Sequence, residues 1–301
     1  MILKTSQCFL HLPWLFSRHE NKNADQTPML KLISSVMTLV LFTSGLRAEE
    51  FDLFILAGQS NAQGWMGDAA KYPADPQGLD AKIRLWWTSP GISSSDGKWT
   101  TMQKQAGRFP VGHFGLEVAF GRKLKLDGCN PAIFKFTLGS TSIANNWKLP
   151  GQGGMYDDMV RQLAAGVELL RQEGHTVKFR GFVWIQGESD AETKPMAQAY
   201  EERLKSLITD LRDRVTRTPD LPMILGVDEQ HPWVVANPEV VQAQQNLAKL
   251  LTACTWTSMK ELEKADSTHL TPAGLVLHGE RIHDAWVQMI RPPAPQKTSN
   301  P

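Results

Sequence analysis

Hydrophobic positions along this chain form short continuous runs, typical of buried strands, which alternate with runs of period near 3.6, typical of amphipathic helices. The first clear run, Phe51 to Ala57, is apolar except for Asp52 and stops at Gly58. It predicts a buried strand followed by a turn. Later runs predict further strands at Ile83 to Thr88, Ala132 to Leu138, Phe179 to Ile185, Leu221 to Val227 and Thr255 to Met259.

Helices are predicted between and after these strands. The clearest, Met155 to Glu173, has one apolar face and two acidic residues in its first turn. The others are Gly115 to Leu126, Ala197 to Val215, Val240 to Leu251, and a last helix that Thr271 caps and that runs from Pro272 to about Ile290. Because strands alternate with helices, we expect one α/β domain, residues 49–291, built as a three-layer α/β/α sandwich around a parallel sheet of about five strands.

The first 48 residues differ from the rest. From Met29 the sequence is typical of a secretory signal, with the basic Lys31, an uncharged apolar run from Leu32 to Gly45, and a small residue, Ala48, at the expected cleavage site. We therefore expect translation to start at Met29, residues 1–48 to be a leader, and the protein to be secreted or periplasmic. A buried first helix is the alternative. Residues 292–301 are Pro-rich and polar, and are predicted to be disordered.

Composition and charge narrow the function. The chain has 301 residues, 42% of them hydrophobic, and a formal net charge of +1. This balance offers no field that would attract nucleic acid or an anionic membrane, so a small neutral ligand or a polysaccharide is the better partner. The leader's apolar run is too short to span a membrane, and the oligomeric state is left open. Of the three cysteines, Cys129 and Cys254 follow the leader, and their positions do not show whether they pair. No metal-binding motif is present, and no cofactor is expected.

Polar residues follow several predicted strands, where the crevice of an open α/β sheet binds ligands. Ser60 lies two residues past the first strand and is the candidate nucleophile, although an ordinary turn serine would look the same. Such a serine needs a histidine base and an orienting acid. Two segments place a carboxylate three residues before a histidine: Asp266 with His269, which we favour because the next helix fixes their loop, and Asp228 with His231. The remaining histidines considered are read as structural, at His113, His175, His278 and His283.

Four blocks in this order resemble the SGNH hydrolase superfamily, and more narrowly its carbohydrate acetylesterase branch, which includes sialate O-acetylesterase-like proteins and acetylxylan esterases. The resemblance spans about Phe51 to Ile290. In the third block the superfamily typically has Gly-x-Asn-Asp, whereas this chain has the Gln-Gly-Glu of the narrower branch. The blocks are Gly58-Gln59-Ser60-Asn61, Gly139-Ser140-Thr141-Ser142-Ile143 with Trp147, Trp184-Ile185-Gln186-Gly187-Glu188-Ser189-Asp190, and Asp266-Ser267-Thr268-His269-Leu270-Thr271.

The resemblance implies a flavodoxin-like fold and a catalytic triad of Ser60, His269 and Asp266. It further implies an oxyanion hole made by the backbone N–H groups of Ser60 and Gly139 and the side chain of Gln186. The activity it implies is removal of O-acetyl groups from a carbohydrate through an acetyl-enzyme. Gln186 has an alternative role, which is to hydrogen-bond loop backbone. The sugar and the acetylated position stay open.

Substrate contacts are less well defined. Trp147, Glu188 and Gln59 are the candidates from the blocks, and Arg108, Glu117 and Asp190 are further possibilities. Tryptophans could stack on sugar faces or anchor the core, and a core role is favoured for Trp184; the set is Trp65, Trp86, Trp87, Trp99, Trp147 and Trp184. The segment 73–112, rich in Gly, Pro, Ser and Lys, is expected to form one wall of a substrate cleft.

Two other functions fit the same pattern. A lipase or thioesterase of the same fold would need an apolar channel beside Ser60, whereas the segment 73–112 is polar and bears tryptophans. A catalytically dead carbohydrate-binding module would have the fold without the chemistry, but every triad position is filled in this chain. Acetate release from acetylated sugars separates the three functions.

Overall fold

A computed structural model describes residues 48–290 of the chain. The predicted signal segment beginning at Met29 and the predicted disordered tail lie outside the described residues. None of the helices between residues 48 and 290 is long and apolar enough to cross a membrane. Within the same range Cys129 and Cys254 are both free thiols and half-buried.

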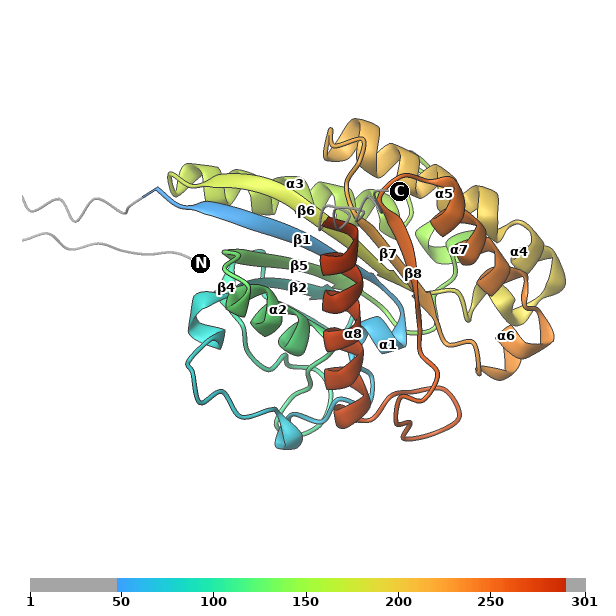
Figure 1. Ribbon diagram of the computed structural model, residues 1–301, viewed down its shortest axis with the longest axis horizontal. Helices are drawn as coiled ribbons and strands as arrows, with labels where there is room; N and C mark the ends of the chain where they lie inside the picture. The colour runs from blue at the N-terminus through green and yellow to red at the C-terminus, as the bar shows by residue number, and fades with distance from the viewer. Residues whose placement is uncertain (1–47, 291–301) are drawn as a thin grey trace, which may run out of the picture. The chain divides into compact units, whose positions relative to one another are not determined.

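The centre of the fold is an eight-stranded sheet with the order β3-β2-β5-β1-β6-β7-β8, in which β4 pairs with β2 (Figure 1). Every longer strand runs parallel to its neighbours, and only the short β3 and β4 are antiparallel. The sheet has more strands than the predicted number of about five, because the two-residue strands β3 and β4 leave no hydrophobic pattern in the sequence. The strands are β1 (Glu50–Gly58), β2 (Arg84–Ser89), β3 (Ser93–Ser94), β4 (Thr100–Thr101), β5 (Pro131–Thr137), β6 (Thr176–Ile185), β7 (Met223–Val227) and β8 (Cys254–Ser258).

Helices cover both faces of the sheet, which confirms the three-layer arrangement (Figure 1). They are α1 (Ser60–Gln63), α2 (Glu117–Leu126), α3 (Met155–Gln172), α4 (Lys194–Gln198), α5 (Tyr200–Asp210), α6 (Pro232–Ala236), α7 (Glu239–Leu250) and α8 (Pro272–Ile290). Shorter 3₁₀ or π turns are η1 (Ala69–Lys71), η2 (Asp80–Lys82), η3 (Ile143–Trp147), η4 (Asp190–Glu192) and η5 (Leu211–Val215). The predicted helix from Ala197 to Val215 is thus divided among α4, α5 and η5.

Alternation along β1 divides the core into two layers. Leu53 and Ile55 pack in one hydrophobic cluster with residues of α3, α5 and α7, whereas Phe54 and Leu56 pack in another with residues of α2 and α8. Successive side chains of a strand point to opposite faces, so a strand that is apolar on both faces must lie between two helical layers. The continuous apolar run of β1 is explained by this central position.

The chain order of the strands reverses at β1. From β1 the chain builds β2 and β5 on one side, then crosses by way of α3 to β6, β7 and β8 on the other side. In open α/β sheets such a switch point opens a crevice beyond the carboxyl ends of the strands. Ser60 follows the carboxyl end of β1 and so lies at this crevice.

Candidate active site

Ser60 stands at a sharp turn between β1 and α1. Gly58 has φ of 143°, and a Cβ atom added to it would lie 2.0 Å from the carbonyl oxygen of Ile185 on β6. Only glycine fits this close approach and this backbone conformation. The chain then enters α1 with Ser60 as its first residue, 8% exposed. The close packing of β1 against β6 therefore holds the predicted nucleophile beyond the carboxyl ends of these two strands.

His269 and Asp266 form a pair on the loop between β8 and α8, here called the His269 loop (residues 259–271). His269 Nδ1 lies 2.9 Å from Asp266 Oδ2 and 3.1 Å from Oδ1. Partial burial alone would raise the pKa of Asp266, but hydrogen bonds from the His269 ring and from the backbone N–H groups of Thr268 and His269 hold that pKa well below its ordinary value. A carboxylate at Nδ1 retains the ring proton there and leaves Nε2 of the imidazole free to accept a proton.

Asn61 connects the His269 loop to the turn that carries Ser60. Its Nδ2 donates to the carbonyl oxygen of Thr268 at 2.9 Å, and its Oδ1 accepts from the backbone N–H of Leu270 at 3.1 Å. One side chain thus hydrogen-bonds to the backbone on both sides of His269. The residue that follows Ser60 is therefore bonded to the two residues that flank His269. The sequence offered Asn61 only as a member of the first block, with no role assigned.

Trp65 and Gly139 complete the surroundings of Ser60. The Trp65 and His269 rings have centroids 6.0 Å apart. A Cβ atom added to Gly139 would lie 3.4 Å from Ser60 Cβ and 3.5 Å from Trp65 Cε3. Trp65 is therefore the tryptophan beside the predicted triad. Trp65 was one of several tryptophans considered as sugar contacts, whereas Trp147 was the predicted one. The position of Trp65 five residues after Ser60 was the available signal.

The N–H group of Gly139, a predicted oxyanion donor, already has an acceptor in this structure. It donates to Gln63 Oε1 at 3.0 Å. Gln63 is fully buried on α1, and its Nε2 has no hydrogen-bond partner within residues 48–290. An oxyanion beside Ser60 would thus compete with the Gln63 carbonyl for this N–H.

Gln186 fits its expected role least well. The side chain is 0% exposed, and Nε2 donates to the carbonyl oxygen of Thr141 at 2.9 Å and to Asp190 Oδ2 at 2.7 Å. Both amide hydrogens are therefore used, and none is left for an oxyanion. Asp190 also accepts from the N–H groups of Ile143 at 2.7 Å and Ala144 at 3.1 Å, and its burial raises the pKa of that carboxyl. These contacts match the alternative in which Gln186 braces loop backbone.

Gln59 and Glu188 do not face the substrate, contrary to the prediction. Both are buried, and Gln59 Oε1 lies 3.5 Å and 3.4 Å from the N–H groups of Gly187 and Ser189. Glu188 Oε1 accepts from the N–H of Asp228 at 3.2 Å, and burial raises the pKa of Glu188 to about 7. Their polar groups therefore bond to other parts of the protein. Gln59 joins the first block to the third, and Glu188 joins the third block to the end of β7.

Trp147 is a core residue, which corrects its assignment as a substrate contact. It is 0% exposed, its Nε1 donates to Thr141 Oγ1 at 3.1 Å, and its ring meets Trp184 edge to face at 4.8 Å. A sugar has no access to a ring enclosed in this way. Trp184 is likewise fully buried, as its place within a strand indicated.

The rival pair of Asp228 and His231 has other partners. Asp228 is fully buried, and Lys264 Nζ from the His269 loop lies 2.6 Å and 2.8 Å from its two carboxylate oxygens. His231 Nδ1 accepts from the N–H of Trp233 at 3.2 Å and caps α6. Asp266 and His269 are the pair with the geometry of a base and its orienting acid. Within residues 48–290 no group of three or more His, Cys, Asp or Glu residues could hold a metal ion.

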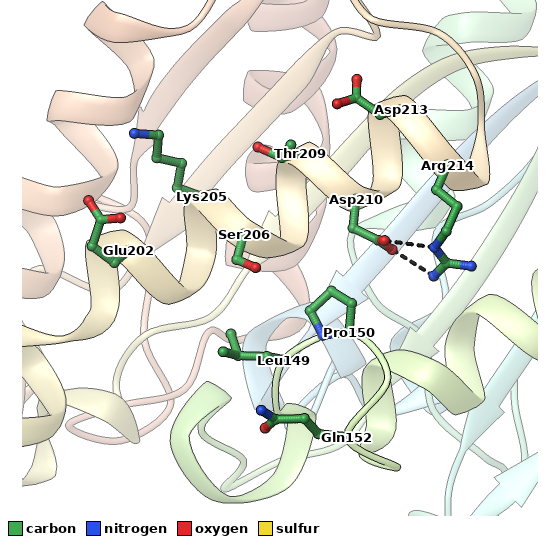
Figure 2. Close-up of a pocket in the computed structure, with 10 residues that line it drawn as sticks. All are labelled: Leu149, Pro150, Gln152, Glu202, Lys205, Ser206, Thr209, Asp210, Asp213 and Arg214. Carbon is green, nitrogen blue, oxygen red and sulfur yellow. Dashed lines mark hydrogen bonds and ion pairs between the residues drawn. The ribbon is translucent and has the colours of Figure 1, made fainter.

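Two hollows lie near these elements. One of about 310 Å³ borders the His269 loop at Ala265 and Thr271 and the opposite loops at Met66 and Phe109. Figure 2 shows a larger pocket of about 620 Å³, between residues 149–152 and the helical segment that contains α5. None of the predicted site residues lines it, and two of its members, Asp210 and Arg214, are already paired with each other at 2.7 Å.

Comparisons with known proteins identify the family and the fold. A family model described as carbohydrate esterase, sialic acid-specific acetylesterase, matches residues 50–288. The comparison with curated proteins gave no match. Among solved structures, a protein from Arabidopsis thaliana is similar with 23% identity and a TM-score of 0.61, over 80% of this chain and 98% of that one.

Two further solved structures share the fold. NanS has 18% identity and a TM-score of 0.58, over 80% of this chain and 98% of its own. A carbohydrate acetylesterase from Xanthomonas citri has 18% identity and a TM-score of 0.51, over 79% of this chain but only 56% of its own. The similarity in all three cases lies in the α/β sheet and its flanking helices.

Proposed function

The chain belongs to the carbohydrate esterase family of sialic acid-specific acetylesterases, and we propose that it removes O-acetyl groups from a carbohydrate through an acetyl-enzyme on Ser60. Membership makes the protein a carboxylic ester hydrolase that acts on acetylated sugars. The finer proposal concerns the residues and the order of the steps. The signal-like segment before residue 49 favours a secreted or periplasmic place of action.

In the first half of the reaction Ser60 Oγ attacks the acetyl carbonyl carbon while His269 Nε2 takes the hydroxyl proton. The carbonyl oxygen becomes an oxyanion in the tetrahedral intermediate. As the intermediate collapses, the bond to the sugar oxygen breaks, His269 returns the proton to that oxygen, and Ser60 keeps the acetyl group. Asp266, kept ionised by its hydrogen bonds, stabilises the imidazolium that forms between these two transfers.

In the second half a water molecule replaces the sugar. His269 takes a proton from the water, the resulting hydroxide attacks the acetyl carbon, and the proton passes to Ser60 Oγ as acetate leaves. The N–H groups of Ser60 and Gly139 are the proposed oxyanion donors, each worth about 3 to 4 kcal/mol of barrier in such sites. The N–H group of Gly139 would give up its hydrogen bond to Gln63 Oε1 and donate to the oxyanion instead. Gln186 would join them only by leaving Thr141 or Asp190, so we assign it to positioning the second block.

The observation that supports this function most directly is the pair of hydrogen bonds between Asn61 and the His269 loop. These bonds of 2.9 Å and 3.1 Å place the Asp266 and His269 pair beside the turn of Ser60, although some 200 residues separate them in sequence. A carbohydrate-binding module without chemistry needs no histidine oriented by a carboxylate at this point. The arrangement therefore supports acyl transfer.

Acetate release by the purified protein tests the proposal. The substrates are acetylated xylan, acetylated pectin, acetylated simple sugars and O-acetylated sialic acid, with a long-chain acyl ester to detect a lipase. We expect release from at least one sugar, and a loss of at least 1,000-fold in Ser60→Ala at unchanged melting temperature. Ser206→Ala, in the pocket of Figure 2, is the matched control and should retain full activity. Equal rates for the wild type and Ser60→Ala would refute the mechanism.

A further inference from the structure

Arg108 places a guanidinium group beside the proposed catalytic residues. Its Nε donates to the backbone carbonyl oxygen of Trp65 at 2.8 Å, and its Cζ lies 3.4 Å from the centre of the Trp65 ring. The same tryptophan has its ring 6.0 Å from that of His269. Arg108 comes from the segment 73–112, which the sequence predicted as a wall of the cleft. Arg108 and His269 thus both lie near the ring of Trp65.

Within residues 48–290 no carboxylate forms an ion pair with Arg108, whose guanidinium lies over the rings of Trp65 and Phe109. Arg122 and Arg214 form ion pairs at 2.7 Å with Asp80 and Asp210. In contrast, Arg108 makes no ion pair within the described range 48–290, and its Nη atoms make no hydrogen bond there. Partial burial lowers the pKa of Arg108, and no carboxylate offsets that effect. The side chain is half-buried, so its unpaired face is within reach of a ligand.

Two other charged residues considered as substrate contacts are excluded by the structure. Glu117 is fully buried and pairs with Lys135 at 2.8 Å. Asp190 is fully buried and accepts hydrogen bonds from Gln186, Ile143 and Ala144. Of the three residues considered, Arg108 alone retains both an accessible surface and an uncompensated charge.

We propose that Arg108 binds a carboxylate of the substrate, and that the enzyme therefore prefers acetylated sugars that carry one. This inference rests on the proposed esterase function and adds a specificity-determining residue to it. A guanidinium presents a planar pair of N–H donors that matches a carboxylate. Stacking on Trp65 and the bond from Nε fix its plane before the substrate arrives, so little side-chain freedom is lost on binding. A sialic acid and a uronic acid both supply this group.

The test compares each acidic sugar with its neutral methyl ester. Rates of acetate release are measured on O-acetylated sialic acid, acetylated glucuronic acid, the methyl esters of both, and acetylated xylan. The variants are Arg108→Gln, which removes the charge, Arg108→Lys, which keeps it without the planar fork, and Lys104→Gln. Lys104 is an exposed cation in the same segment and is the matched control.

We expect Arg108→Gln to lower kcat/KM by roughly 10- to 100-fold on an acidic sugar and by less than about threefold on its methyl ester and on xylan. Arg108→Lys should recover part of the preference, and Lys104→Gln should leave it unchanged. A selective loss on either acid supports the inference and identifies the source of the carboxylate.

Three results would overturn the inference. Equal losses on acid and methyl ester would mean that Arg108 only supports the fold of its loop. A wild type that does not distinguish the two would remove the proposed preference while leaving the esterase function intact. Absence of acetate release from every substrate would overturn the esterase function, and the inference with it.

Discussion

Replacing Glu188 with glutamine should stabilise the protein increasingly as the pH rises from about 4.5 to about 7. Glu188 is 2% exposed and lies close enough to Asn61 for that side chain to influence its pKa. Oε1 accepts from the N–H of Asp228 at 3.2 Å, while Oε2 has no hydrogen-bond partner within residues 48–290. Burial raises the pKa of this carboxyl from 4.5 to about 7, because the hydration that the charged form loses outweighs the hydrogen bonds that favour it, and the nearby charge of Asp228 opposes it further.

The magnitude follows from the two pKa values. Below about pH 4 Glu188 is protonated in both the folded and the unfolded chain. Between the unfolded value of 4.5 and the folded value of about 7 only the unfolded chain loses the proton, so stability falls as the pH rises. Above the folded value the loss is complete. A shift of this size corresponds to about 3 kcal/mol in the free energy of unfolding.

Urea unfolding at pH 4, 6 and 8.5, followed by tryptophan fluorescence, measures this effect. The difference in unfolding free energy between Glu188→Gln and the wild type should grow in favour of glutamine by about 3 kcal/mol from the lowest to the highest pH. Glu192→Gln, at an exposed position on the same segment, is the control and should show no such trend. A difference that is constant with pH, or that favours glutamate at pH 8.5, would show that Glu188 is not a buried, poorly compensated carboxyl.

Two further predictions concern the supports of the site. Asn61→Ala removes both hydrogen bonds to the His269 loop and should lower kcat/KM by about 10- to 100-fold, because a small displacement of the base from Ser60 is sufficient to slow the reaction. The hydrogen bond between Asp266 and His269 should remain. An unchanged rate of acetate release would contradict this prediction. Lys135→Met leaves the buried carboxylate of Glu117 without its ion-pair partner and should lower the unfolding free energy, measured in urea, by about 3 to 5 kcal/mol. Adding Glu117→Leu should recover most of the lost unfolding free energy. No recovery in the double variant would show that packing, rather than charge, dominates.

Much of the fold could be read from the sequence because its strands are buried on both faces. The runs Phe51 to Ala57 and Ala132 to Leu138 correspond to β1 and β5, and Thr271 caps α8 by accepting from the N–H of Gly274 at 3.1 Å. Parallel strands bring their carboxyl ends to one edge, so polar clusters after strands were expected to meet there. The two-residue strands β3 and β4 were missed because they are too short to show a period.

The site was harder to predict wherever a residue's role depends on its partner. Trp147 and Trp65 are chemically identical, and only packing decides that the first is enclosed beside Trp184 while the second lies next to His269. Gln186 carries the donors that an oxyanion needs, yet Thr141, in the second block, and Asp190, four residues further along in the same block, take both of them. The partner in the second block leaves no trace in the local pattern around Gln186.

The four sequence blocks therefore serve mainly to hold one another. Asn61 joins the first block to the fourth and Gln59 reaches the third, while Gln63, two residues after the first block, bonds to Gly139 of the second. These side chains position Ser60 and the His269 pair without touching substrate, so their substitution should affect every substrate alike. Discrimination between sugars must then come from residues outside the blocks that face the crevice. We propose that Trp65 and Arg108 have that position, so changing Arg108 should separate specificity from catalysis.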